Sequence, residues 1–234
     1  MTELFLIRHG QSSNNALADQ SRRVCDPELT EIGLVQAEKV AAFLAERGHL
    51  VGTGVSAADG PALDRLYCSA MIRALHTAAP IGKALGLSPE AWVDIHETGG
   101  IFLDRPDGSG VDSFPGEGRS AILARFPDCV LPEAIGEEGW WNGDRESAEA
   151  GQQRALSIAQ ILRRQATAGE RIGLVTHGDF MSHLIKALLG VEQGPEVYID
   201  HRNTAITCLK IPPGEGIVVG YVNRFEHLEK AQIT

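Results

Sequence analysis

The chain has 234 residues, of which 43% are hydrophobic and 22% charged, and its formal net charge is −10. This composition is typical of a folded globular protein, while the negative charge argues against non-specific binding to nucleic acid or to an anionic membrane. No apolar run approaches the roughly 20 residues of a membrane span, and the N-terminus lacks the basic stretch of a signal peptide, so we expect a cytoplasmic protein.

The first predicted strand and helix are read from apolar spacing. Residues 4–7 form an unbroken apolar run that stops at polar residues, which is typical of a strand covered on both faces. Thr30 and Gly33 lead into a stretch whose apolar residues recur every three or four positions. This spacing predicts a helix, and we expect it to end at Gly48.

A second strand and helix follow. Residues 65–68 predict a short strand, and Ser69 is a suitable cap for a helix that runs to Gly86. Pro80 falls inside that helix and should kink or limit it.

Residues 99–143 differ from the rest, because they contain the turn-rich segments PDGSG, FPGEG and FPDCVLPE without sustained periodicity. A featureless loop of that length is unusual inside a domain. We therefore interpret residues 1–234 as a single domain in which residues 99–145 form a cap-like insertion with short helices.

Regular patterns return after the insertion. We expect helices at 146–165 and 180–189, the second ending at Gly190, and strands at 171–176, 205–211 and 217–222. The Pro- and Gly-rich residues 212–216 indicate that the last two strands form a hairpin or lie side by side. The alternation of strands and helices predicts an α/β fold with three layers, α/β/α, and a mainly parallel central sheet.

Two of the predicted strands end in a histidine followed by a glycine, His9-Gly10 and His177-Gly178, and Arg8 directly precedes the first pair. One such strand end is more often a simple turn, but two of them in one sheet favour a shared site. Ligands of parallel sheets bind at the carboxyl ends of the strands.

An anion site is the chemistry that these strand ends favour. Arg73 lies one turn into the helix that starts after residues 65–68, where free N–H groups attract anions and a guanidinium matches phosphate oxygens. Alone it would be read as a surface arginine. Together, Arg8, His9, Arg73 and His177 are suited to surround one small dianion.

Five motifs resemble those of the histidine phosphatase superfamily, the phosphoglycerate mutase-like proteins. They occur in the family's order and span most of the chain outside 99–143: LIRHGQS with Asn15, LTEIG followed by QA, CSAMIRA followed by TA, VTHG, and NTAI at 203–206.

The resemblance implies a role for each matching residue. His9 is the nucleophile and forms a phosphohistidine, while Arg8, Arg73 and His177 hold the phosphoryl oxygens. Asn15 is implied as a further phosphate ligand, although a role in the local turn is an alternative.

The resemblance places the general acid within residues 92–97, and we take Glu97 as this acid and then as the base toward water in the second step. An ion-pair role for Glu97 is the alternative, and Asp104 is the reserve candidate. Residues 98–101 depart from the longer stretch that follows this acid in the family's mutases, which argues against mutase activity. Gln11 and Ala70 also depart from the family pattern without touching the proposed chemistry.

The insertion is expected to roof the pocket. Arg105 and Arg119 are candidates to recognise a second acidic group, and Trp140, beside Trp141, to pack on the substrate. The alternative, which we favour, is that the tryptophans fix the insertion to the core.

No metal or cofactor is expected, because two arginines supply positive charge and Cys25, Cys68, Cys129 and Cys208 are too scattered for a zinc site. These cysteines should be reduced and mostly buried.

The sequence thus predicts a metal-independent phosphatase acting on a small phosphorylated metabolite, with a second copy of the chain as the expected partner in any oligomer and no nucleic acid or membrane partner. The alternatives are a phosphoglycerate-type mutase and a non-catalytic module that binds a phospho-ligand or a protein.

Overall fold

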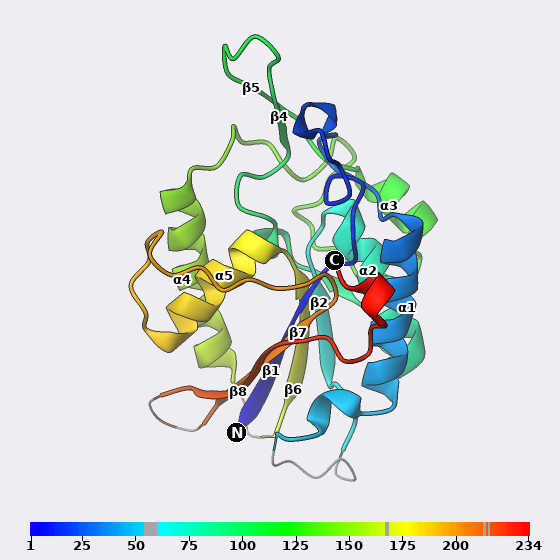
Figure 1. Ribbon diagram of the computed structural model, residues 1–234, viewed down its shortest axis with the longest axis vertical. Coiled ribbons are helices and arrows are strands. Elements are labelled where there is room, and N and C mark those ends of the chain that lie inside the picture. Colours follow the sequence, from blue (N-terminus) through cyan, green and yellow to red (C-terminus); the bar gives the residue numbers. More distant parts are fainter. Residues whose placement is uncertain (54–59, 167–168, 213, 215) are drawn as a thin grey trace.

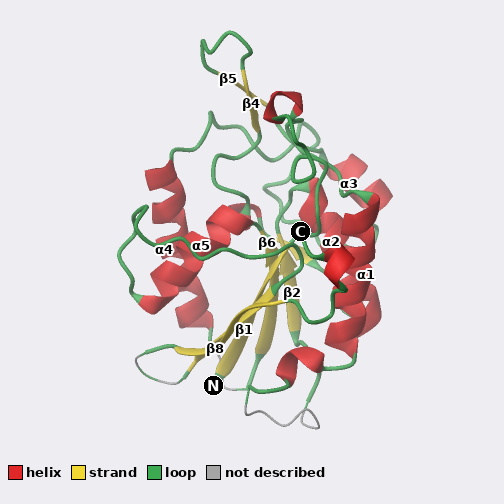
Figure 2. Cartoon of the chain, in the orientation of Figure 1, coloured by secondary structure: helices red, strands yellow, loops and turns green. Residues whose placement is uncertain are grey.

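A central sheet lies between two pairs of helices in the computed structural model, which describes all residues except 54–59, 167–168, 213 and 215 (Figures 1 and 2). Its six strands run in the order β3-β2-β6-β1-β7-β8. They span Glu90–Ala91 (β3), Arg65–Cys68 (β2), Arg171–Thr176 (β6), Thr2–Arg8 (β1), Ile206–Ile211 (β7) and Val218–Arg224 (β8). The first four are parallel and the last two antiparallel, which confirms the predicted α/β fold with a mainly parallel sheet.

β1 shows why the sheet is covered on both sides. Leu4 and Leu6 join the core beneath α4 and α5, whereas Phe5 and Ile7 join the core beneath α1 and α2. All four side chains are essentially inaccessible to solvent, and each contributes about 1.5–3 kcal/mol through burial. The helices span Glu31–Ala45 (α1), Ile72–Leu85 (α2), Ala148–Gln165 (α4) and Gly178–Leu189 (α5).

The start of α1 follows the prediction, but its end does not. Thr30 accepts a hydrogen bond from the Gly33 N–H at 3.0 Å and caps the helix. The helix ends at Ala45, not at Gly48, because Arg47 already takes the left-handed conformation with φ of 61°.

The start of α2 also differs from the prediction. Ser69 does not cap the helix; Met71 is the N-terminal flanking residue, and Ser69 Oγ accepts a hydrogen bond from the Met71 N–H at 3.2 Å. Gly86 ends the helix in the left-handed conformation as predicted, and Pro80 lies inside the helix, which continues past it.

The insertion contains a helix, as predicted, and a hairpin that was not. The helix is α3 (Arg119–Arg125), and β4 (Phe102–Asp104) pairs with β5 (Val111–Ser113) in a hairpin that projects beyond the end of the sheet where β1 and β6 finish (Figure 1). Buried insertion side chains join the core of α1 and α2, among them Ile101, Ile122 and Trp140.

The remaining elements connect these layers. Short 3-10 helices occur at Gln20–Arg22, Gly48–Leu50, Val93–Ile95 and Lys230–Gln232. β7 and β8 form the predicted hairpin; positions 213 and 215 of its connection lie outside the described residues.

Two further observations concern the chain as a whole. All four cysteines are free thiols. None of the helices among the described residues has the length and apolar character needed to cross a membrane, and the expected cytoplasmic location stays a prediction.

Candidate active site

The two histidines that follow β1 and β6 lie side by side. These strands are parallel neighbours with Arg8 opposite Thr176, and the His9 N–H donates to the Thr176 carbonyl at 2.9 Å. Because of this register, β1 and β6 end at the same edge of the sheet. There the ring centroids of His9 and His177 lie 5.0 Å apart.

Arg73 reaches this pair from the first turn of α2. Its Nε donates to His9 Nε2 at 3.1 Å. The loop after His9 is tied to the same helix, because the Gly10 N–H donates to Thr77 Oγ1 at 3.0 Å.

The contacts of His9 define its protonation. Nδ1 lies 2.6 Å from the Gly10 carbonyl, which can only accept, so Nδ1 carries the proton and Nε2 presents a lone pair. Burial, followed by the charges of Arg73 and Arg8, holds the pKa of His9 well below its usual value. His9 is therefore a neutral imidazole at neutral pH, as a nucleophile must be.

His177 is fully buried and also neutral. Its pKa is lowered mainly by burial and then by the neighbouring Arg73 and His9. Nε2 lies 2.8 Å from the hydroxyl of Ser69, at the end of β2, and Nδ1 is buried without a hydrogen-bond partner in the described part of the chain.

Arg8 adds a second fixed cation. One Nη donates to the His201 carbonyl, and Nε is buried with no partner among the described residues. Gly178 lies beside Arg8, since a Cβ there would be in van der Waals contact with Arg8 Nε at 3.4 Å.

Glu97 lies at the N-terminus of α5. Its carboxylate accepts hydrogen bonds from the N–H groups of Thr98 at 2.9 Å and Phe180 at 3.0 Å. Burial and the nearby charge of Asp179 raise the pKa of Glu97, against the opposing effect of Arg73. A carboxyl group of this kind can hold a proton at higher pH than usual and donate it.

Asp26 was missed by the sequence analysis. Its carboxylate accepts from Arg73 Nη1 at 3.4 Å and from the Ile72 N–H at 3.3 Å, and burial raises its pKa to about 6. The signal available was an acidic residue just before the Thr30 cap, but nothing in the spacing connects that loop with α2.

Asn15 takes part in a turn. Its Oδ1 accepts from the Ser12 N–H at 3.1 Å and from Asn203 Nδ2 at 3.4 Å, and Asn203 also donates to the His9 carbonyl at 2.9 Å. These contacts support the alternative reading of Asn15 and link it to the His9 backbone; its role as a phosphate ligand stays a prediction.

The polar insertion candidates contact other groups. Arg105 pairs with Asp112 at 2.8 Å within the hairpin, and Arg119 donates to backbone carbonyls of the insertion. The reserve acid Asp104 pairs with Arg145 at 3.2 Å. None of these contacts reaches the histidine pair.

The two tryptophans of the insertion pack against the core. Trp140 is only 6% exposed, and the rings of Trp140 and Trp141 lie 5.8 and 4.8 Å from that of His96, which precedes Glu97 in the chain. This placement supports the interpretation that they fix the insertion to the core.

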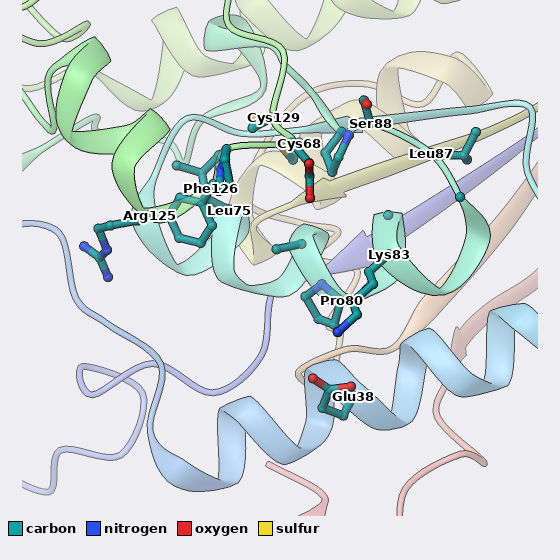
Figure 3. A pocket seen from close by; sticks show the side chains of 16 residues that line it. Glu38, Cys68, Leu75, Pro80, Lys83, Leu87, Ser88, Arg125, Phe126 and Cys129 are labelled. Carbon is teal, nitrogen blue, oxygen red and sulfur yellow. The ribbon is translucent and has the colours of Figure 1, made fainter.

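A separate cleft of about 490 Å³ opens between α2 and α3 (Figure 3). Its lining includes Cys68, Lys83, Arg125 and Cys129 and none of the five proposed catalytic residues. Within the described part of the chain, no group of three or more His, Cys, Asp or Glu side chains is placed to hold a metal ion.

Arg8, Arg73 and the neutral rings of His9 and His177 therefore meet at one edge of the sheet, near a carboxyl group with a raised pKa. His177 Nδ1 has no partner there among the described residues. The model of the histidine phosphatase superfamily (branch 1) matches residues 4–224. The chain belongs to this superfamily.

Two curated proteins are similar to this chain in sequence. A probable phosphoglycerate mutase GpmB of Yersinia pestis is 24% identical over 226 residues, covering 95% of this chain and 91% of the relative. A PE-PGRS family protein of Mycobacterium tuberculosis is 34% identical over 101 residues, covering 43% of this chain; the match spans only 15% of that relative.

Solved structures of superfamily phosphatases share the fold. A phosphoserine phosphatase mutant of Entamoeba histolytica in complex with phosphoserine has a TM-score of 0.57 at 22% identity, over 98% of this chain and 100% of that one. A mycobacterial glucosyl-3-phosphoglycerate phosphatase in complex with VO3 has a TM-score of 0.57 at 20% identity, over 95% and 98%.

Proposed function

We propose that this superfamily member is a metal-independent phosphatase that hydrolyses a small phosphorylated metabolite through a phosphohistidine on His9. The observation that carries the proposal is His9 Nε2, which has its lone pair on a neutral ring and accepts a hydrogen bond from Arg73 Nε at 3.1 Å. A bound phosphoryl oxygen would take over that N–H, which frees the lone pair for attack. A basic nitrogen among fixed cations is suited to attack phosphorus in a bound dianion.

In the first step, His9 Nε2 forms a bond to phosphorus while the bond from phosphorus to the ester oxygen breaks. Glu97 gives its proton to the departing oxygen, and Arg8 and Arg73 balance the charge of the phosphoryl group. The imidazole becomes cationic, and the Gly10 carbonyl that accepts its Nδ1 proton stabilises this charge.

In the second step, the Glu97 carboxylate takes a proton from water, whose oxygen bonds to phosphorus as the nitrogen–phosphorus bond breaks. Inorganic phosphate leaves, neutral His9 is restored and Glu97 is again protonated. The arginines supply the positive charge in both steps, so the scheme requires no metal ion.

A small cavity lies near Arg73. A cavity of about 270 Å³ lies between the insertion and the loop before α1, lined by Asp26, Ile72, Ile101 and Gly116 among others. Ile72 precedes Arg73 and Asp26 pairs with it, so this cavity lies near Arg73, although Arg73 and His9 are not in its lining.

A mutase is the second candidate function, because the GpmB relative covers nearly the whole chain. A mutase must protect the phosphohistidine from water and return the phosphoryl group to a second oxygen. Release of inorganic phosphate from 3-phosphoglycerate, compared with its isomerisation, separates the two activities.

The phosphatase proposal is tested with purified protein, a chelator and a panel of phosphorylated metabolites together with an aryl phosphate. We expect turnover by the wild type, an acid-labile phosphoenzyme, and loss of both in His9→Ala. His183→Gln, a histidine of α5, is the matched control and should remain active. Full activity in His9→Ala, or a strict need for a divalent ion, would contradict the proposal.

Glu97→Gln tests the acid. It should lose far more activity toward alkyl phosphates than toward an aryl phosphate whose leaving group needs no proton. An equal loss toward both substrates would remove Glu97 from the proposed role.

A further inference from the structure

The buried ring of His177 has two nitrogens in different surroundings. Nε2 lies 2.8 Å from Ser69 Oγ, while Nδ1 is buried without a partner in the described part of the chain. A neutral imidazole has one N–H and one lone pair. The contacts around Ser69 decide which nitrogen has the proton.

The Ser69 hydroxyl can donate one proton and accept at its oxygen. Ser69 is fully buried, and its oxygen already accepts from the Met71 N–H at 3.2 Å. Of the contacts made by Ser69 among the described residues, only His177 Nε2 can take the hydroxyl proton. If Nε2 donated instead, the Ser69 hydroxyl proton and the Nδ1 lone pair would both lack a partner among the described residues, whereas only the Nδ1–H lacks one when Ser69 donates. Each unpaired buried group costs about 1–3 kcal/mol, so Ser69 donates and Nε2 accepts.

This direction of donation places the ring proton on Nδ1. The resulting Nδ1–H has no protein acceptor, and its ring lies 5.0 Å from the ring of His9. It is thus a free donor on the residue beside the nucleophile. The opposite tautomer would turn a lone pair toward an anionic phosphoryl group, which is repulsive.

We infer that Ser69 is a positioning residue: by donating its proton to His177 Nε2, it holds the tautomer in which His177 Nδ1–H donates to the transferring phosphoryl group. The role of that donor rests on the proposed function. The tautomer and its dependence on Ser69 do not, since they follow from the contacts of the free protein.

The tautomer is measured directly by long-range ¹H–¹⁵N NMR of the wild-type protein at neutral pH, with His177→Gln used to assign the ring. We expect a protonated Nδ1 and an unprotonated, hydrogen-bonded Nε2. A proton on Nε2 would overturn the inference, and this measurement decides it even if variants of Ser69 fail to fold.

Ser69→Ala then tests the dependence. Nε2 loses its donor, so the spectrum should show Nε2–H, and affinity for inorganic phosphate and kcat/KM should each fall about tenfold, equivalent to ~1.4 kcal/mol. The control is Ser182→Ala, which removes a buried hydroxyl that accepts from the Ile199 N–H at 3.0 Å and should change neither value.

The outcomes separate the two proposals. An unchanged tautomer and phosphate affinity in Ser69→Ala would refute the role of Ser69, whatever the enzyme does. A wild type that hydrolyses no ester, but binds inorganic phosphate about tenfold more tightly than Ser69→Ala and has the Nδ1–H tautomer, would support the role of Ser69 while rejecting the phosphatase.

Discussion

At the scale of single residues, the Arg73 guanidinium contacts His9 through one nitrogen and Asp26 through another. Nε points to His9, and Nη1 pairs with Asp26, whose carboxylate also accepts the Ile72 N–H. Burial and the positive charges of Arg23 and Arg8 lower the pKa of the Arg73 guanidinium, and the negative charge of Asp26 opposes this. Asp26 thereby fixes the direction in which Arg73 presents its Nε.

Asp26→Asn should therefore lower kcat roughly tenfold at pH 7.5, because Arg73 loses a charged partner and its alignment with His9. Burial raises the pKa of Asp26 to about 6, so the wild type loses the same charge as the pH falls through 6. The ratio of wild-type to Asp26→Asn kcat should decrease over that range; titration of the substrate phosphate near pH 6 cancels in this ratio.

A pH-rate profile of both variants checks this expectation. Asp112→Asn is the matched control, since it breaks an exposed Asp–Arg pair at the hairpin and should follow the wild type at every pH. A wild-type to Asp26→Asn ratio that stays constant from pH 8 to 5 would show that the Asp26 charge does not act on Arg73.

The sequence predicted the positions of those site residues that directly follow a recognisable strand or helix start. His9 and His177 follow apolar strands directly, and Arg73 follows a strand and a helix start, so their meeting needed only a parallel sheet. Asp26 gave no such signal, and Ser69 was interpreted as a helix cap. The partner of each is set by tertiary packing: Arg73 lies 47 residues from Asp26, and His177 lies 108 residues from Ser69.

At the scale of elements, the loop that follows His9 and α1 meet through backbone contact. A Cβ on Gly33 would lie 2.1 Å from the Gln11 carbonyl oxygen, and a Cβ on Gly10 would lie 2.6 Å from the Gly33 carbonyl oxygen. Neither backbone can move aside without shifting the other. The glycine pair therefore sets how closely α1 approaches the loop that follows His9.

Gly33→Ala should lower the free energy of unfolding by about 1–3 kcal/mol through overpacking and should also reduce kcat, because Gln11 is two residues from His9, the proposed nucleophile. Urea unfolding and steady-state kinetics measure both effects. Gly136→Ala is the control, since the nearest atom to its Cβ lies 3.8 Å away. Wild-type stability in Gly33→Ala would mean that the contact relaxes without cost.

Element ends were harder to predict than the elements themselves. Both the Gly48 end of α1 and the Ser69 cap of α2 were wrong, because a left-handed Arg47 and the bond between Ser69 and Met71 replace the expected local signals. The β4–β5 hairpin escaped prediction because each strand has three residues, too few to show an alternating pattern.

At the scale of the whole molecule, burial keeps histidines neutral far from the proposed active site as well as in it. His49 is an example: its Nε2 is 3.0 Å from the Ala62 carbonyl, its ring lies edge-on to Phe5, and burial lowers its pKa to about 4. In the unfolded chain the pKa of histidine is about 6.5. Between these values the unfolded state binds more protons, so stability rises with pH.

The free energy of unfolding should therefore fall as the pH drops from about 6.5 toward 4, and His49 alone accounts for about 3 kcal/mol of that loss. His49→Gln keeps a donor for the Ala62 carbonyl but cannot take a proton, so its stability should decline less steeply with acid. Urea unfolding at pH 7, 6 and 5 measures the difference.

His76→Gln is the control, because Glu28 opposes the lowering of the His76 pKa and a smaller change in slope is expected. Parallel pH profiles for wild type and His49→Gln would mean that His49 gains its proton without opening the core.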